Sequence, residues 1–450
     1  MHTFSNLLVS AASAAALTAA EKPNVLFFLA DDHQAALLSA LGNTSIKTPH
    51  LDKLLNRGTY FSNAHAEFPT SAPSRASILS GCSGLTHGAI YPKWTNYFKS
   101  ELVPYTWTQT MKKGGYETAW MGKWNTHGSI ETFGVDHPSC IKVGGMGPHW
   151  LKAKGFDGKS YEGFSSTVFC DAAIRYLDSY NAEKPFFMTV AFTAPHDPRT
   201  PPKEFEEMYK NAEVPFPKNF MPNHPFDDGY TNIRDERLLP RPRKKDAVTN
   251  EIRKYYGLIT QMDEQIGRTI KALEDKKLLD NTIIIFCGDH GLSLGHHGLL
   301  GKFNMYTHST QTPLIFAGPG IPKSKKDSLV YLHDIYPTIC EMAGLEIPKS
   351  VEGKSLASII VGKEEKVRDY IFCANSNLQR MVRNKRYKLI RFYRDEKEKK
   401  GTDKFVFFDL KTDSNELKNR IDSPEYADIV KVLKKELMQW QRSHNDFLLD

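Results

Sequence analysis

The sequence has no closely spaced cysteines, no internal repeat and no low-complexity tract. Its six cysteines lie far apart in 450 residues without a C-x-x-C pair, which excludes a zinc ribbon and a dithiol redox motif. With 40% hydrophobic and 25% charged residues, the composition is that of a globular protein and excludes collagen, coiled coil and extensive disorder. The length allows a large core and excludes a small binding module.

The N-terminal segment also lacks charge. Residues 1–20 contain no Lys, Arg, Asp or Glu, and residues 7–20 read LLVSAASAAALTAA. This run is shorter than the roughly 20 apolar residues of a membrane span and is typical of a secretory signal peptide cleaved near residue 20. A buried N-terminal helix is the alternative. No other stretch is apolar enough to cross a bilayer, so we expect an exported protein, periplasmic or secreted, without a membrane span.

The net charge of +7 comes from one region. Residues 380–404 hold eleven Lys and Arg against four acids, an excess equal to that of the whole chain. Such a patch can attract a polyanion, including nucleic acid or a sulfated glycan. No nucleic-acid motif accompanies it, so we expect no nucleic-acid partner and interpret the region as a solvated charged hairpin.

Buried strands alternate with helices through the first 350 residues. Helices are predicted at 48–59, with Thr48 as the N-cap, and at 251–278, and strands at 24–30, 116–121, 185–192 and 282–287. Strands buried on both faces indicate an α/β fold, with a large mainly parallel sheet and helices on both faces. We assign residues 21–360 to this main domain.

The remainder of the chain has a different character. It is more charged, with short predicted strands and a closing amphipathic helix at 369–373, 387–392, 405–410 and 426–443. We therefore predict a smaller α+β subdomain at residues 361–450.

Polar side chains follow three of the predicted strands. Asp31-Asp32, His196 and Asp289-His290 each come directly after a strand. Ligands bind beyond the carboxyl ends of parallel strands, so these groups are expected to meet at one edge of the sheet. Three carboxylates and one imidazole suit Ca²⁺ or Mg²⁺, and there are too few histidines for a two-zinc site. The alternative for each acidic pair is a loop cap.

A second motif indicates an anion site. Ser71-Ala-Pro-Ser-Arg75 precedes a helix predicted to begin at Ser74. A group at Ser71 then lies near the helix N-terminus, whose free N–H groups favour an anion. Arg75 adds a guanidinium suited to a tetrahedral oxyanion. The alternative is an ordinary loop.

Residues 71–81 resemble the signature of the type I sulfatases of the alkaline phosphatase superfamily: Cys or Ser, any residue, Pro-Ser-Arg, then a small or apolar stretch ending in Thr-Gly or Ser-Gly. The resemblance runs from Lys22 to about Asn419 and includes, in family order, NVLFFLADDH, GYETAWMGKW, KPFFMTVAFTAPHDP, TIIIFCGDHGLSLGHHGLLGKFNMYTHS and FFDLKTDSNELKN. It implies an alkaline phosphatase-like fold, with residues 21–360 as the catalytic sulfatase domain.

The resemblance also implies a modified nucleophile and a metal ion. Ser71 is expected to be oxidised to formylglycine by a sulfatase-maturing enzyme. The hydrated aldehyde has one hydroxyl to attack sulfur and a second to release the sulfate, which an unmodified serine lacks. The modified residue is expected to hold one divalent cation, Ca²⁺ or alternatively Mg²⁺, together with Asp31, Asp32, Asp289 and His290.

Further catalytic residues are placed by the same resemblance. Arg75 is expected to neutralise charge on the sulfate with the ion, and Lys123 and Lys302 match the two sulfate-binding lysines. His196 matches the histidine that protonates the leaving oxygen or assists the nucleophile, a role that suits an imidazole titrating near neutrality, although such a residue alone also reads as a hydrogen-bonded strand-end histidine.

One position departs from the family pattern. The family reads Gly-Lys-Trp-His where this chain has Gly-Lys-Trp-Asn125-Thr-His127. Either His127 reaches the formylglycine or Asn125 contacts it without acid–base capacity.

The expected substrate is a sulfated saccharide, because the resemblance is to bacterial exo-acting carbohydrate sulfatases. The pattern favours terminal sulfated galactose or N-acetylgalactosamine. Polar residues expected to line the sugar subsite, with a polar loop covering the site as the alternative, are His296, His297, Asn304 and His308. Two other functions remain open: a phosphodiesterase or phosphonate monoester hydrolase of the same superfamily, and a non-catalytic sulfated-glycan binding protein.

Overall fold

The computed structural model describes residues 22–90, 100–126, 128–145 and 149–449. The predicted signal peptide therefore lies outside the described residues. Within them, the main sheet has eight strands in the order β10-β2-β9-β8-β1-β7-β3-β4. The bounds are β10 (Ser324–Tyr331), β2 (Thr59–His65), β9 (Gln311–Ala317), β8 (Thr282–Gly288), β1 (Asn24–Ala30), β7 (Phe186–Ala191), β3 (Glu117–Lys123) and β4 (Ile141–Val143).

The sheet is mainly parallel, as the sequence predicts. Among the described strands of this sheet, β9 alone runs antiparallel to its neighbours, β2 and β8. β1 pairs in parallel with β7 on one side and β8 on the other. All seven residues of β1 are buried, which explains its unbroken apolar sequence.

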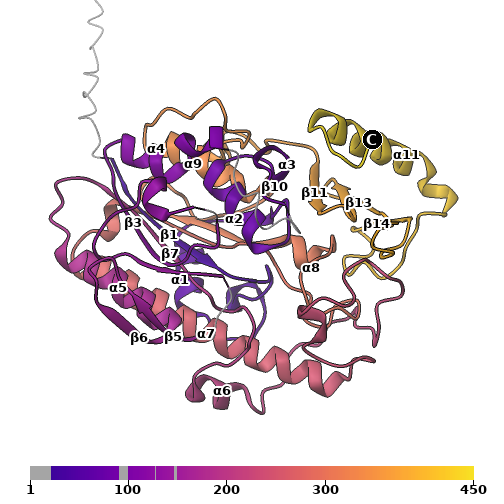
Figure 1. Cartoon of the computed structure of the whole chain (residues 1–450), viewed down its shortest axis with the longest axis horizontal. Coiled ribbons are helices and arrows are strands. Elements are labelled where there is room, and N and C mark those ends of the chain that lie inside the picture. Colours follow the sequence, from indigo (N-terminus) through magenta and orange to yellow (C-terminus); the bar gives the residue numbers. More distant parts are fainter. Residues whose placement is uncertain (1–21, 91–99, 127, 146–148, 450) are drawn as a thin grey trace, which may run out of the picture.

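Helices cover both faces of the sheet (Figure 1). One group consists of α1 (Pro49–Arg57), α5 (Ser165–Ser179) and α7 (Lys245–Asp275), and the other of α2 (Ser71–Ser80), α4 (Trp107–Lys113) and α9 (Ile335–Met342). Shorter helices are α3 (Gly84–His87), α6 (Lys203–Tyr209), α8 (Thr307–Thr310) and α10 (Ala357–Ile360), and a hairpin of β5 (Trp150–Lys154) and β6 (Ser160–Phe164) lies beside β4. In the described part of the chain, no helix is long and apolar enough to span a membrane.

The start of α1 corrects one local prediction. Thr48 occupies the N-cap position, but its side chain makes no capping hydrogen bond. Instead the Asp263 carboxylate, from α7, accepts the backbone N–H groups of His50 at 3.1 Å and Leu51 at 2.7 Å. A tertiary contact replaces the local cap.

The C-terminal part is an antiparallel sheet covered by one helix, which confirms the α+β prediction. The strands are β11 (Ile371–Asn375), β12 (Gln379–Arg383), β13 (Tyr387–Phe392) and β14 (Lys404–Asp409), paired in that order. α11 (Ala427–Ser443) packs on β12 and β13, and this unit lies at the end of the molecule drawn in yellow in Figure 1.

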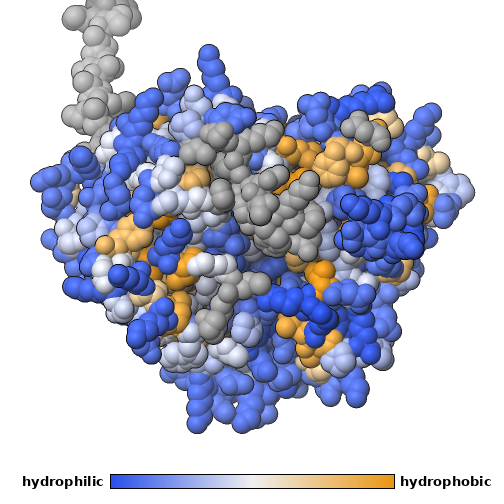
Figure 2. Space-filling view, in the orientation of Figure 1, coloured by the Kyte–Doolittle hydropathy of each residue, from blue (hydrophilic) through white to orange (hydrophobic). Residues whose placement is uncertain are grey.

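The basic region is less solvated than expected. Arg380, Arg383 and Lys388 are buried, and Arg380 and Lys388 are paired with Asp446 and Glu416. The other basic residues of the region are exposed or partly exposed and contribute to the hydrophilic surface visible where Figure 1 places β13 and β14 (Figure 2). The interpretation as a charged hairpin therefore holds for part of the region only. All six cysteines are buried free thiols.

Candidate active site

The polar groups at the strand ends meet, as predicted. β8, β1, β7 and β3 are consecutive in the sheet, so the residues that follow them lie side by side. The Asp31 N–H donates to the Ala194 carbonyl and the Asp289 N–H to the Ala30 carbonyl, each at 3.0 Å. These bonds join the chain segments just beyond the ends of β1, β7 and β8 and bring both acidic pairs to one edge.

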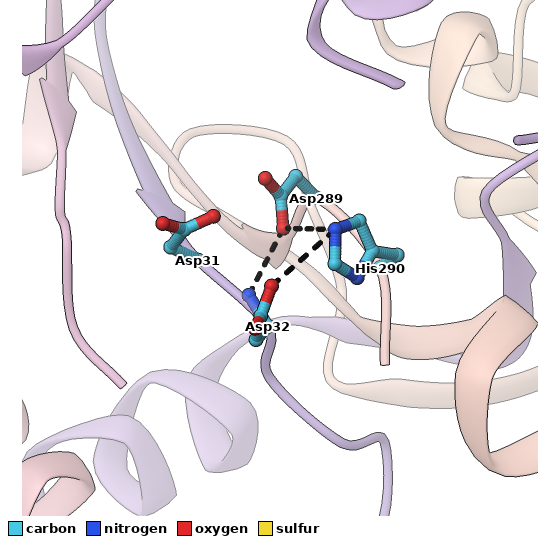
Figure 3. A group of neighbouring side chains, drawn as sticks. All are labelled: Asp31, Asp32, Asp289 and His290. Atoms are coloured by element: carbon cyan, nitrogen blue, oxygen red, sulfur yellow. Dashed lines mark hydrogen bonds and ion pairs between the residues drawn. The ribbon is translucent and has the colours of Figure 1, made fainter. Parts of the chain in front are cut away.

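Asp31, Asp32, Asp289 and His290 form a compact buried cluster (Figure 3). One ligand atom from each lies within 4.8 Å of the others. The His290 Nδ1–H donates to the Gly291 carbonyl at 2.8 Å, which leaves the Nε2 lone pair free. That Nε2 lies 3.4 Å from Asp32 Oδ1. Buried carboxylate oxygens with one free imidazole lone pair fit a hard divalent cation.

Each carboxylate of the cluster is also paired with a buried cation. Lys123 contacts Asp31, Lys302 Nζ lies 2.8 Å from Asp32 Oδ1, and Arg75 Nε lies 2.9 Å from Asp289 Oδ2. Burial alone raises the pKa of Asp31, but Lys123, His196, Arg75 and Lys302 outweigh it and hold this pKa well below 3.8. Asp31 therefore keeps its negative charge at neutral pH.

Ser71 is the first residue of α2. The helix begins here rather than at the predicted Ser74, because Pro73 is tolerated in the first turn. The Ser71 hydroxyl donates to Asp31 Oδ1 at 2.9 Å and lies 3.1 Å from His290 Nε2. It therefore sits both at the positive end of a helix and in the cluster.

Arg75 contacts the carboxylates of the cluster without lining the cavity. It is 1% exposed and is not among the residues that line the cavity described next. Its Nη1 donates to the Lys123 carbonyl at 3.3 Å, and its Nη2 lies 3.5 Å from Asp31 Oδ1. The contacts of Arg75 therefore indicate that it positions the carboxylates of the cluster. The structure gives less support to the expected direct contact between Arg75 and the sulfate.

A cavity of about 360 Å³ opens over Ser71, a volume typical of small-molecule sites. Lys123 and Lys302, the predicted sulfate-binding lysines, both line it. Burial lowers the pKa of Lys123 despite the opposing effect of Asp31. Burial also acts to lower the pKa of Lys302, but Asp32 and Asp235 outweigh it and raise the pKa. The full lining is Thr70, Ser71, Lys123, Asn125, Gly145, His196, Ile233, Arg234, Asp235, Lys302 and Phe303.

His196 is neutral in this site. Its Nδ1–H donates to the Asp197 carbonyl at 2.6 Å, so Nε2 carries the lone pair. Burial first, and then the charge of Lys302, lowers the His196 pKa to about 3. The expected titration near neutrality does not hold for this state, in which Nε2 is unprotonated and can accept a hydrogen bond.

Asn125, one of the two alternatives for the role of the family's histidine that the resemblance left open, lies at the cavity wall. Its φ of 47° is in the left-handed region, which asparagine tolerates. The preceding Trp124 is buried, with its ring 4.9 Å from Trp120 and 5.0 Å from Phe133, and this packing fixes the turn. His127, the alternative for this role, lies outside the described residues.

The four residues predicted to line the sugar subsite lie elsewhere. The His297 Nε2–H donates to the Glu416 carbonyl at 2.9 Å, and the Asn304 amide donates to Ser293 Oγ at 2.9 Å. The rings of His296 and His308 stack at 4.8 Å. None of the four is among the cavity-lining residues. His297 joins the loop to Glu416 of the C-terminal subdomain, while Asn304 and His296 bond to Ser293 and Asn219 of the main domain.

Sequence reasoning missed Ile233, Arg234, Asp235 and Phe303, which also line the cavity. The first three belong to the irregular stretch between α6 and α7, where no period or motif marks them. An adjacent Arg-Asp pair in such a stretch was the only available signal.

Comparisons with known proteins agree with this geometry. A family model described as "Sulfatase" matches residues 23–345, and one described as "N-sulphoglucosamine sulphohydrolase, C-terminal" matches residues 295–443. An arylsulfatase of Clostridium perfringens is 30% identical over 93% of this chain and 94% of its own length. An N-acetylglucosamine-6-O-sulfatase of Bacteroides thetaiotaomicron is 27% identical over 95% of this chain and 87% of its own.

A solved structure supports the same relationship. A protein in complex with its substrate, D-glucosamine-2-N,6-O-disulfate, superposes with a TM-score of 0.80 at 25% identity, covering 95% of this chain and 99% of that chain.

Proposed function

Because this chain belongs to the sulfatase family and is a sulfuric ester hydrolase, we propose that it removes sulfate from a sulfated saccharide by means of a formylglycine made from Ser71 and one bound divalent cation. The observation that carries the proposal is the position of the Ser71 hydroxyl. It lies 2.9 Å from Asp31 Oδ1 and 3.1 Å from His290 Nε2, beneath a cavity lined by two lysines.

The two added groups have limited, defined roles. Formylglycine, produced from Ser71 by a maturing enzyme, supplies a hydrated aldehyde with one hydroxyl for attack on sulfur and a second for release of sulfate. The cation, held by Asp31, Asp32, Asp289, His290 and the modified residue, supplies positive charge opposite the sulfate oxygens. We propose Ca²⁺, with Mg²⁺ as the alternative, because the donors are mainly carboxylates.

The chain's own side chains bind the sulfate, position the metal-binding carboxylates and contact the attacking hydroxyl. Lys123 and Lys302 each pair with a cluster carboxylate and line the cavity, so they are placed to bind the non-bridging sulfate oxygens. Arg75 fixes Asp31 and Asp289. His196 lines the cavity with an unprotonated Nε2, which is placed to accept a hydrogen bond from the attacking hydroxyl.

We propose a terminal sugar as substrate, in line with a cavity of about 360 Å³. Among the relatives, one is named an N-acetylglucosamine-6-O-sulfatase, and one solved structure holds its substrate D-glucosamine-2-N,6-O-disulfate. The sequence favours sulfated galactose or N-acetylgalactosamine, and both series belong in a substrate panel. The predicted leader at residues 1–20 supports action outside the cytoplasm, where such glycans occur.

Two measurements test the proposal. The tryptic peptide 58–75, from protein made in its own host, should have lost two hydrogen atoms at Ser71. That protein should release sulfate from at least one monosulfated saccharide in the panel, faster than it hydrolyses matched phosphate or phosphonate esters. An unmodified Ser71, with glycan binding but no sulfate release, would favour a non-catalytic glycan-binding protein. Faster hydrolysis of phosphonate or phosphate esters than of sulfate esters would favour a phosphonate monoester hydrolase or phosphodiesterase.

Cation binding is expected to stabilise the fold as well as support activity. Free Ca²⁺ at about a thousand times its Kd should add about 4 kcal/mol to the free energy of unfolding, and chelation should remove it. Three buried carboxylates converge on the site, so their mutual repulsion is relieved by the ion. Thermal unfolding with Ca²⁺, Mg²⁺ or chelator measures the shift.

Asp289→Asn should lose most of this Ca²⁺-dependent shift. Asp228→Asn is the matched control, because Asp228 is also a buried carboxylate but lies outside the cluster. Burial raises the pKa of Asp228 to about 7, so replacing its carboxyl with an amide is conservative. A shift of the same size in both variants would place the ion elsewhere.

A further inference from the structure

One wall of the cavity lies outside the sulfate-binding part of the site. It is formed by Arg234 and Asp235, which line the cavity together with Lys302 and Phe303. We call Arg234 and Asp235 the Arg-Asp pair. Neither residue belongs to the metal cluster or to the motif around Ser71.

Arg234 is held rigidly by two carboxylates. Its Nη2 donates to Asp197 Oδ1 at 2.9 Å and to Asp235 Oδ1 at 2.8 Å, and its Nε donates to Asp235 Oδ1 at 3.1 Å. The Arg234 side chain is 39% exposed, against 5% and 8% for its two partners. Its Nη1 has no hydrogen-bond acceptor among the described residues, so this donor is available to a ligand.

Asp235 offers an acceptor next to that donor. Its Oδ2 is buried and has no hydrogen-bond partner within the described structure. Lys302 Nζ is 3.9 Å away, and this ammonium lies closer to Asp32, at 2.8 Å. A buried carboxylate oxygen without a donor is costly, and a hydroxyl group of a bound ligand would satisfy it.

The charge of this wall distinguishes it from the sulfate-binding part. Arg234 faces two carboxylates, Asp197 and Asp235, so the wall has no net positive charge to offer a second anion. A second sulfate or a uronate carboxylate placed there would meet the carboxylates. A neutral group that both donates and accepts hydrogen bonds fits the Arg-Asp pair.

We propose that the Arg-Asp pair recognises, by hydrogen bonding, free hydroxyl groups on the sugar that carries the scissile sulfate. One hydroxyl donates to Asp235 Oδ2, and it or its neighbour accepts from Arg234 Nη1. The pair therefore selects saccharides that are unsulfated at the positions beside the scissile ester. This inference rests on the proposed function and extends it from sulfated saccharides in general to those with this hydroxyl pattern.

The test uses the full-length, modified, Ca²⁺-loaded enzyme. Substrates are the monosulfated hexose that it hydrolyses fastest, deoxy analogues at each neighbouring position, the disulfated counterpart, and an aryl sulfate without sugar hydroxyls. The wild-type kcat/KM should fall about 100-fold for one deoxy analogue and at least as far for the disulfated sugar. The first arm needs no variant and is independent of folding defects.

Variants supply the second arm. Asp235→Asn and Arg234→Lys should lower the ratio of kcat/KM for the sugar sulfate to that for the aryl sulfate by about 10- to 100-fold. Arg237→Ala, an exposed residue in the same short turn, is the matched control and should keep the ratio. The Asp235→Asn penalty should shrink on the deoxy analogue that lacks the contacted hydroxyl.

Several results would overturn the inference. The first is that every deoxy analogue has the same kcat/KM as the parent sugar. The second is a higher kcat/KM for the disulfated sugar than for the monosulfated one. The third is an equal loss of kcat/KM on sugar and aryl sulfates in the variants. Equal losses would assign the pair to support of Lys302. If the wild type releases sulfate from neither sugar nor aryl sulfate, the proposed function fails and the inference falls with it.

Discussion

Ser71→Ala is expected to lower sulfate release at least about 10⁴-fold, to the background of the assay. Alanine cannot be oxidised to an aldehyde, so the variant lacks the hydroxyls that attack sulfur and release sulfate. The fold should be unaffected, because the Ser71 hydroxyl contacts only Asp31 and His290 among the described residues. Steady-state kinetics on the best saccharide and thermal unfolding measure the two properties.

Binding separates lost chemistry from a damaged site. Lys123 and Lys302 remain in Ser71→Ala, so calorimetry should show the sulfated saccharide binding within about tenfold of the wild type. Ser80→Ala is the matched control, because Ser80 is buried in the same helix with its hydroxyl bonded to the Ala76 carbonyl. It should retain full activity. Turnover by Ser71→Ala within tenfold of the wild type would remove Ser71 from the nucleophile's role.

Much of the main domain could be predicted because its signals are local. An unbroken apolar run of strand length flanked by polar pairs predicts a buried parallel strand, and β1, Asn24–Ala30, was predicted to the residue. β12, Gln379–Arg383, could not be found in this way. Its arginines predict a solvent-exposed segment when the sequence is considered locally. They are buried because partners far along the chain, such as Asp446, neutralise their charge.

The same distinction applies within the site. Asp31, Asp289 and His196 follow strands, and the rule that such ends share an edge brings them together without knowledge of strand order. Arg234 and Asp235 lie in an irregular stretch, and only tertiary packing places them at the cavity. The pKa of His196 likewise depends on burial and on Lys302, so its neutral state could not be derived from the sequence.

Arg380→Ala is expected to lower the free energy of unfolding by about 3–5 kcal/mol. Arg380 is fully buried, with Nε 2.6 Å from Asp446 Oδ2 and Nη2 2.7 Å from Asp446 Oδ1. Its Nη1 also donates to the Ser376 and Gln379 carbonyls. Alanine would leave the buried Asp446 carboxylate unpaired and free the chain after α11. Urea unfolding measures the change.

Two further variants identify the cause of this loss. Arg394→Ala breaks a pair with Glu396 in which the two side chains are 43% and 79% exposed, so its effect should be small because solvent screens the pair. The double variant Arg380→Met/Asp446→Leu should recover much of the stability lost in Arg380→Ala, since it removes the unpaired charge and keeps apolar volume. If the double variant is as unstable as the single one, the carbonyl contacts of Arg380 stabilise the subdomain rather than the ion pair. If Arg394→Ala is equally destabilising, burial does not explain the difference between the two arginines. The buried ion pair would then not be the reason why β12 tolerates Arg380.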